Sequence, residues 1–111
     1  MQSQYRLKSR ASFSYVYKRG KSVSEREMVL VYLKTQRGLK AGFSVSKKVG
    51  NSVVRNRVRR LMKENFRMVL PDVLDGYNYI FVARPSLLGK TFWEVGEIMK
   101  RLLQKGSLLK K

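Results

Sequence analysis

A continuous amphipathic segment from Asn51 to Leu70 is the feature that most constrains how this chain can fold. Asn51 or Ser52 can begin a helix here, and Pro71 ends it because proline cannot continue a helix. At about 1.5 Å per residue, the helix is roughly 30 Å long. One side needs a core to pack against, and the other needs solvent or an anion. The apolar side holds Val54, Val58, Leu61, Met62, Asn65 and Val69, and broadly opposite lie Asn56, Arg59, Arg60, Lys63 and Arg67.

The charge of the whole chain favours the anion. Its 111 residues include 25 lysines and arginines but only seven aspartates and glutamates, a formal net charge of +18. A compact domain with this charge repels itself, and its usual partner is a polyanion, most often nucleic acid. Residues 1–67 hold 18 of the basic residues and three acidic ones, so we expect the anion-binding surface mainly there.

The residue types that are missing exclude several kinds of active site. Without histidine or cysteine the chain lacks the usual general base, the usual catalytic-metal ligand and a thiolate nucleophile. The acidic residues are scattered, whereas hard-metal sites gather acids from several elements. We therefore expect no catalytic residue, no metal site and no small-molecule substrate. No apolar run could span a membrane and the N-terminus lacks a signal-peptide core, so we expect a cytoplasmic protein that does not bind membranes.

The remaining periodicity predicts a small α+β domain. Ser9 or Ser12 can cap a first short helix that ends at Gly20. Residues 27–33, 41–46 and 77–83 predict strands, the first two spaced for a hairpin, and a weaker strand is expected at 21–24. Thr91 and Glu94 form a capping box for a last helix that ends near Gly106, with Trp93 expected as a core anchor. We predict one domain over residues 1–111, an α/β sandwich with helices packed on one small sheet.

The segment from Lys47 to Arg60 carries the strongest functional signal. Two lysines and Gly50 precede a helix start, and four arginines follow within two turns. Free N–H groups at a helix N-terminus bind anions, and arginine forks bind phosphates in a bidentate manner. Phe13 and Tyr17, flanked by basic residues, suit single-stranded nucleic acid, although their spacing equally fits core packing. Tyr32, Ser44 and Ser46 are similarly ambiguous.

Residues 43–61 resemble the protein subunit of bacterial ribonuclease P, whose Arg-Asn-Arg signature is present as Arg55-Asn56-Arg57. Matches to Arg6-Leu7, Phe13, Val16, Gly20 and residues 79–84 extend the resemblance over essentially the whole chain. The resemblance implies the order α-β-β-β-α-β-α with a mixed sheet. It also implies a left-handed β-α-β crossover, whereas the general rule predicts a right-handed one.

The resemblance further implies a role in removing the 5′ leader of precursor tRNA. The partners would be the catalytic RNA subunit and precursor tRNA, with catalysis and Mg²⁺ belonging mainly to the RNA. The residues implied in RNA binding are Lys47, Lys48, Asn51, Arg55, Asn56, Arg57, Arg59, Arg60, Lys63 and Arg67. Those implied in the cleft for the leader, between the first helix and the sheet, are Phe13, Tyr17, Ser44, Ser46 and Tyr32.

Two points stay open at this stage. Some family members place the cleft aromatic where this chain has Val31, and a shift of one residue moves a strand side chain to the other face. The main alternative function is a ribosomal-type structural RNA-binding protein. A stand-alone Mg²⁺ nuclease and a DNA-binding module are further alternatives.

Overall fold

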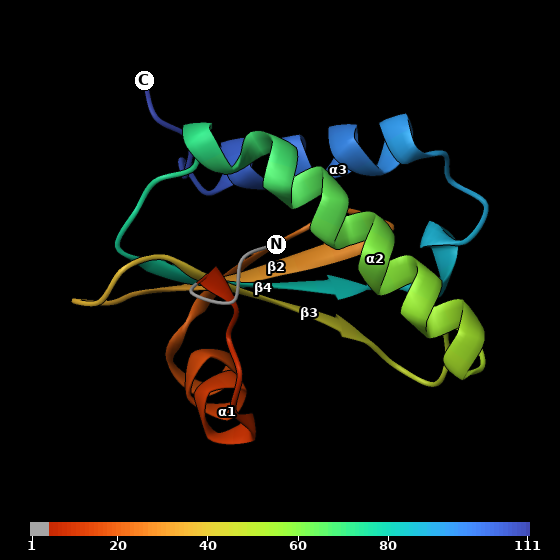
Figure 1. The fold of residues 1–111 in the computed structure, drawn as a ribbon. Helices are drawn as coiled ribbons and strands as arrows, with labels where there is room; N and C mark the ends of the chain where they lie inside the picture. The colour runs from red at the N-terminus through yellow and green to blue at the C-terminus, as the bar shows by residue number, and fades with distance from the viewer. Residues whose placement is uncertain (1–4) are drawn as a thin grey trace.

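The computed structural model describes residues 5–111, which form three helices and one four-stranded sheet (Figure 1). In chain order the elements are α1 (Arg10–Arg19), β1 (Lys21–Ser24), β2 (Met28–Lys34), β3 (Lys40–Val45), α2 (Ser52–Val69), β4 (Tyr77–Ala83) and α3 (Phe92–Lys105). Short 3₁₀ turns lie at Leu70–Asp72 and Pro85–Leu87. Helices α2 and α3 cover one face of the sheet, and α1 packs on the other. The order of elements is the one that the family resemblance implied.

The strands lie in the order β1-β2-β4-β3. β1 with β2 and β2 with β4 are antiparallel, whereas β3 with β4 is parallel. The predicted hairpin between β2 and β3 is therefore wrong, because β4 lies between them. β4 carries buried side chains on both faces, Tyr79 and Phe81 on one and Ile80 on the other. Its position inside the sheet, with helices packed on both sides, buries both faces.

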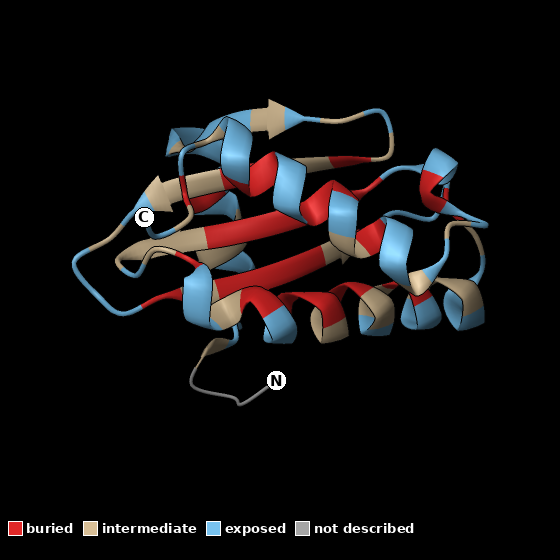
Figure 2. Cartoon of the chain, turned by 90° about the horizontal axis from the view of Figure 1, so that it is seen from above, coloured by how far each residue is buried: buried red, intermediate tan, exposed pale blue. Residues whose placement is uncertain are grey.

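Parallel pairing makes β3–α2–β4 a crossover connection. Figure 2 views the sheet from the side of α2 and α3. Looking along β3 in its chain direction with α2 above the sheet, β4 lies to the left of β3. The crossover is therefore left-handed, as the family resemblance implied and against the general rule.

Each helix begins at a side-chain cap that the sequence predicted. The Ser9 hydroxyl accepts a hydrogen bond from the Ser12 N–H (3.0 Å), and Asn51 Oδ1 accepts one from the Val54 N–H (3.0 Å). Thr91 and Glu94 form the reciprocal capping box. These caps satisfy N–H groups that have no partner within the helix, which fixes where each helix starts.

The sheet separates a large core from a small one. Figure 2 shows the side of the large core, with buried residues of the sheet and of the helices above it in red. The large core lies under α2 and α3, where the Phe66 ring packs 5.5 Å from Phe81 and 5.9 Å from Phe43, centroid to centroid. Phe66 belongs to the apolar side of α2 although the sequence analysis did not place it there. The small core under α1 consists of Leu7, Val16, Val31 and Ile80.

Trp93 does not anchor the core, because its side chain is 72% exposed. Once Thr91 caps α3, the turn of about 100° per residue puts Trp93 roughly opposite Val95, Ile98 and Leu102, which are buried. The expectation for Trp93 was wrong because it relied on nearness in sequence to apolar residues rather than on the side of the helix.

Candidate nucleic-acid interface

One flank of α2 carries a row of cations. Arg55, Arg59, Lys63 and Arg67 are spaced four residues apart, so they lie above one another along the helix. We call these four residues the cationic ridge. Arg67 pairs with Glu64 (2.8 Å), and Arg59 Nη2 donates a hydrogen bond to Asn56 Oδ1 (2.5 Å). The other ridge residues form no ion pair with any residue in the described range 5–111, so their charge remains free for an external anion.

The other cations predicted to bind RNA surround this ridge. Arg57 and Arg60 are exposed on the solvent side of α2, and Lys47 and Lys48 are exposed in the turn that follows β3. Asn51 is exposed too, but its side chain is used as the cap of α2. The start of α2 therefore presents a helix N-terminus and several free cations on one continuous stretch of chain.

Arg55 is a partly buried member of the ridge, and its guanidinium includes a nitrogen without a partner in the part of the chain that the structure describes. Its Nε is shielded from solvent and has no hydrogen-bond partner among the described residues. A buried donor without a partner costs free energy, so a phosphate oxygen that reached it would gain a strong, charge-assisted bond.

A groove joins the cationic ridge to α1. It is lined by Arg6, Leu7, Lys8, Phe13, Gly42, Phe43, Arg59 and Lys63, and we call it the Phe13 groove. Its volume is about 240 Å³, and no acidic residue is among those that line it. A Cβ atom at position 42 would lie 2.3 Å from Phe13 Cζ, so only glycine lets this ring lie over β3. The groove thus combines an aromatic ring with four cations.

Three other residues predicted for the leader cleft lie on α1 or on and just after β3, whereas the fourth, Tyr32, lies elsewhere. Tyr17 is largely exposed on α1, with its ring 6.4 Å from that of Phe13, and Ser44 points to the same face of β3 as Gly42. Ser46 is exposed just beyond the end of β3.

Arg6 and Lys8 line the groove but were not predicted. They reach it through a β-bridge between Arg6 and Ala41, which no sequence pattern signals.

Tyr32 is not part of this surface, which corrects its placement in the cleft. Val31 packs in the small core beside α1, whereas Tyr32 packs on the opposite face, against the large core. Side chains alternate along a strand, so the residue next to a cleft position points away from the cleft. The Tyr32 ring lies 6.3 Å from that of Tyr77 instead.

Several acidic side chains have structural partners. Lys105, followed by Arg101, holds the pKa of Glu25 below its ordinary value, and the backbone N–H groups of Leu39 and Gly76 lower the pKa of Asp75. Hydrogen bonds with Thr91 likewise lower the pKa of Glu94. Within residues 5–111, no three Asp or Glu side chains gather as a metal site would require, and no helix is both long and apolar enough to cross a membrane.

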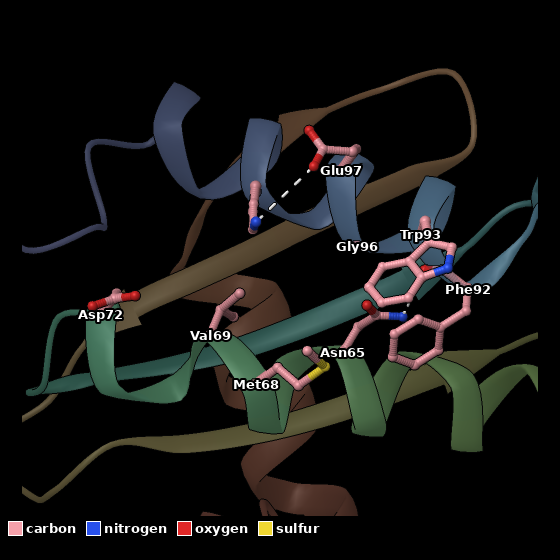
Figure 3. Close-up of a pocket in the computed structure, with 9 residues that line it drawn as sticks. Asn65, Met68, Val69, Asp72, Phe92, Trp93, Gly96 and Glu97 are labelled. Atoms are coloured by element: carbon pink, nitrogen blue, oxygen red, sulfur yellow. Dashed lines mark hydrogen bonds and ion pairs between the residues drawn. The ribbon is translucent and has the colours of Figure 1, made fainter.

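The opposite flank of α2 has a different character (Figure 3). There Asn65 and Met68 of α2 face Phe92 and Trp93 of α3 across a second pocket. Asn65 Nδ2 donates to the Phe92 carbonyl (3.2 Å), which ties the two helices together. Asp72 and Glu97 are among the residues that line this pocket. The two flanks of α2 therefore differ in charge, and only the ridge side suits a polyanion.

Comparisons with known proteins place the chain in a family. The family model described as Ribonuclease P matches residues 1–107. The ribonuclease P protein component of Clostridium kluyveri is 47% identical over 109 residues, covering 96% of this chain and 97% of that protein. For the protein component of Clostridium beijerinckii the identity is 44% over 112 residues, with 94% and 90% covered.

Solved structures show the same fold. The RNase P protein of Staphylococcus aureus matches with a TM-score of 0.87 at 30% identity, covering 96% of this chain and 98% of that one. The RNase P protein from Thermotoga maritima matches with a TM-score of 0.83 at 28% identity, with 90% and 96% covered. With the family model and these relatives covering nearly the whole chain, the protein belongs to the ribonuclease P protein family.

Proposed function

We propose that this chain binds the catalytic RNA of ribonuclease P and the single-stranded 5′ leader of precursor tRNA, assisting removal of the leader. The observation that carries the proposal is the Phe13 groove, where cations from α2 and the N-terminal segment surround an aromatic ring and no acid intervenes. Single strands are bound by such combinations, because bases stack on rings while cations follow the backbone.

Arg55 and Arg67 of the cationic ridge, with the exposed cations around it, are assigned to the catalytic RNA, whereas Arg59 and Lys63 line the Phe13 groove and are assigned to the leader. Arg55, Arg57 and Arg60 supply permanent charge that offsets the repulsion between the catalytic RNA and its RNA substrate. The unpartnered Nε of Arg55 supports a direct phosphate contact at the start of α2. Phosphate contacts of this kind position the protein without reading sequence.

The chemistry is assigned to the RNA and to Mg²⁺ ions that it holds. The carboxylates of Glu25, Asp75 and Glu94 already accept hydrogen bonds within the fold, so these three acids serve its structure. The protein's share is to bind, orient and neutralise charge. Because its cations offset repulsion between the two RNAs, fewer Mg²⁺ ions are needed for that task and cleavage proceeds at lower bulk Mg²⁺ concentration.

Cleavage of a precursor tRNA with a cognate catalytic RNA, at low Mg²⁺ and with or without this protein, tests the proposal. Only the combination should cleave at the mature 5′ end. The double variant Arg59→Gln/Lys63→Gln should raise the KM for a substrate with a leader about tenfold, and far less for one without a leader. Arg26→Gln/Lys110→Gln, which removes two exposed charges elsewhere, is the matched control.

Two outcomes would reject the proposal. If the protein binds structured RNA but leaves cleavage unchanged, the ribosomal-type structural role replaces it. If the protein cleaves without any RNA partner, the assignment of the chemistry to the RNA is wrong.

A further inference from the structure

We propose that a further pocket, where β2 ends and β4 begins, binds one unpaired RNA nucleotide outside the Phe13 groove. The pocket is lined by Arg19, Lys21, Tyr32, Leu33, Lys34 and Tyr77, and we call it the two-tyrosine pocket. It shares no lining residue with the Phe13 groove. The inference rests on the proposed function in one respect, namely that the chain's partner is RNA.

The sheet builds this pocket by placing each tyrosine opposite a lysine. Lys21 is the partner of Tyr32 across β1 and β2, and Lys34 is the partner of Tyr77 across β2 and β4. Directly paired residues of antiparallel strands project to the same face, so each ring has a cation beside it. The Thr35 N–H donates to the Gly76 carbonyl (2.8 Å), which fixes the chain at this end of both strands.

The two rings form a surface for a flat ligand. Their centroids lie 6.3 Å apart with the planes tilted by 58°, and Tyr77 also packs 5.9 Å from the buried ring of Tyr79. Both rings are partly buried, so each is held in place while keeping some exposed surface. Every base has a π-face, and stacking on such a ring tolerates any sequence.

The charges around the rings select an anionic ligand. Arg19, Lys21 and Lys34 form no ion pair with the residues that the structure describes, and no acidic residue is among those lining the pocket. Asp75, the nearest acid in sequence to Tyr77, instead accepts the N–H groups of Leu39 and Gly76. Aromatic surface together with cations that form no ion pair is the combination that binds an unpaired nucleotide.

The size and place of the pocket favour one nucleotide of a single strand. Its volume is about 240 Å³, which accommodates one ring system and no duplex. Arg19 lies on the same helix as Phe13, about 9 Å further along its axis. Helix α1 therefore contributes a lining residue to each of the two sites.

Amide NMR shifts of the whole chain, titrated with a short oligouridine RNA, test the inference. We expect the signals of Tyr32, Lys34 and Tyr77 to move as well as those of Phe13 and Gly42. Lys21→Gln/Lys34→Gln should weaken binding at the pocket about tenfold and leave the Phe13 groove unchanged. Arg26→Gln/Lys110→Gln, which removes the same charge elsewhere, should change neither site.

Two further variants distinguish the contribution of the aromatic ring from that of the charges, and binding at the pocket from binding in the Phe13 groove. Tyr77→Leu keeps apolar bulk in place, so the chain folds, but it removes the stacking surface and should weaken the pocket about tenfold. Arg59→Gln/Lys63→Gln should weaken binding in the Phe13 groove about tenfold while the shifts at Tyr32 and Tyr77 persist.

The inference is overturned if Tyr32 and Tyr77 stay unmoved at an RNA concentration that saturates the Phe13 groove. It is equally overturned if inorganic phosphate alone reproduces their shifts, because the pocket would then be a simple anion site. A silent pocket beside a responding groove rejects this inference and leaves the proposed function standing. If neither site responds, the proposed binding of single-stranded RNA is rejected as well.

Discussion

At the scale of single residues, Gly42 controls whether Phe13 can lie over β3. Because a Cβ atom there would lie 2.3 Å from Phe13 Cζ, Gly42→Ala must displace the ring from the groove. We expect the variant to lose about 1–3 kcal/mol of unfolding free energy, measured by urea denaturation, because the site becomes overpacked. We also expect weaker binding of a single-stranded leader, measured by fluorescence anisotropy.

Gly38→Ala is the matched control for this substitution. A Cβ atom at Gly38 meets nothing within 4 Å, so the control should change stability by less than about 0.5 kcal/mol and leave leader binding intact. Equal losses for both variants would show that Gly42 has no special relation to Phe13.

The side of a helix or strand on which a residue lies could be predicted only where the start of that element was known to the residue. The polar and basic side of α2 and the buried side of α3 followed from helical spacing and cap residues, and the structure confirms them. Tyr32 and Trp93 were misplaced because each depends on a shift of one or two positions, which reverses direction in a strand or on a helix. The part of the groove contributed by Arg6 and Lys8 comes from a β-bridge between distant segments, and local pattern carries no information about it.

At the scale of elements, Glu25 fastens the turn between β1 and β2 to α3. It pairs with Arg101 (2.8 Å) and with Lys105, while Lys105 also donates to the Ser24 carbonyl (2.7 Å). These partners lower the pKa of Glu25 in the folded state, so the contact stabilises the fold above the unfolded pKa of about 4.5 and is lost as pH falls below it. Glu25→Gln should therefore cost about 1 kcal/mol or less at neutral pH, and less still in acid.

Urea denaturation of both proteins between neutral and acid pH measures this difference. The two stability curves should converge as pH falls through the range just below 4.5, where Glu25 takes up its proton in the wild type. Glu97→Gln is the control, because Glu97 only meets Lys100 at 4.0 Å within the same helix. A gap for Glu25→Gln that does not change with pH would contradict an electrostatic contact.

The arrangement of elements was predictable only in part for a related reason. Local signals define the helices and strands, but the pairing of β4 with both β2 and β3 depends on which strand buries most surface. The same holds for the left-handed crossover through α2, which the general rule for βαβ units predicts incorrectly. Only the resemblance of residues 43–61 to a known family supplied that information.

At the scale of the whole molecule, the net charge of +18 acts on stability and on RNA affinity in opposite directions. Raising salt from about 10 mM to about 150 mM shortens the Debye length from about 30 Å to about 8 Å. Repulsion between the chain's own cations is then screened, and each 1 kcal/mol gained raises Tm by about 4–8 °C. Over the same range, affinity for RNA should fall by orders of magnitude. Binding releases counterions from the RNA, and their release into a more concentrated salt solution gains less free energy.

Thermal unfolding and RNA binding measured in one salt series test both effects, and two double variants separate them. Arg57→Gln/Arg60→Gln and Arg26→Gln/Lys110→Gln each remove two exposed charges, so both should raise Tm at low salt by similar amounts. Only the first pair lies on α2, so only it should flatten the plot of log affinity against log salt, by about 0.7–0.9 per lost phosphate contact. Self-repulsion depends on how much charge the fold carries, whereas RNA binding depends on where that charge lies. Equal slopes for the two variants would mean that RNA is bound by diffuse charge rather than by α2.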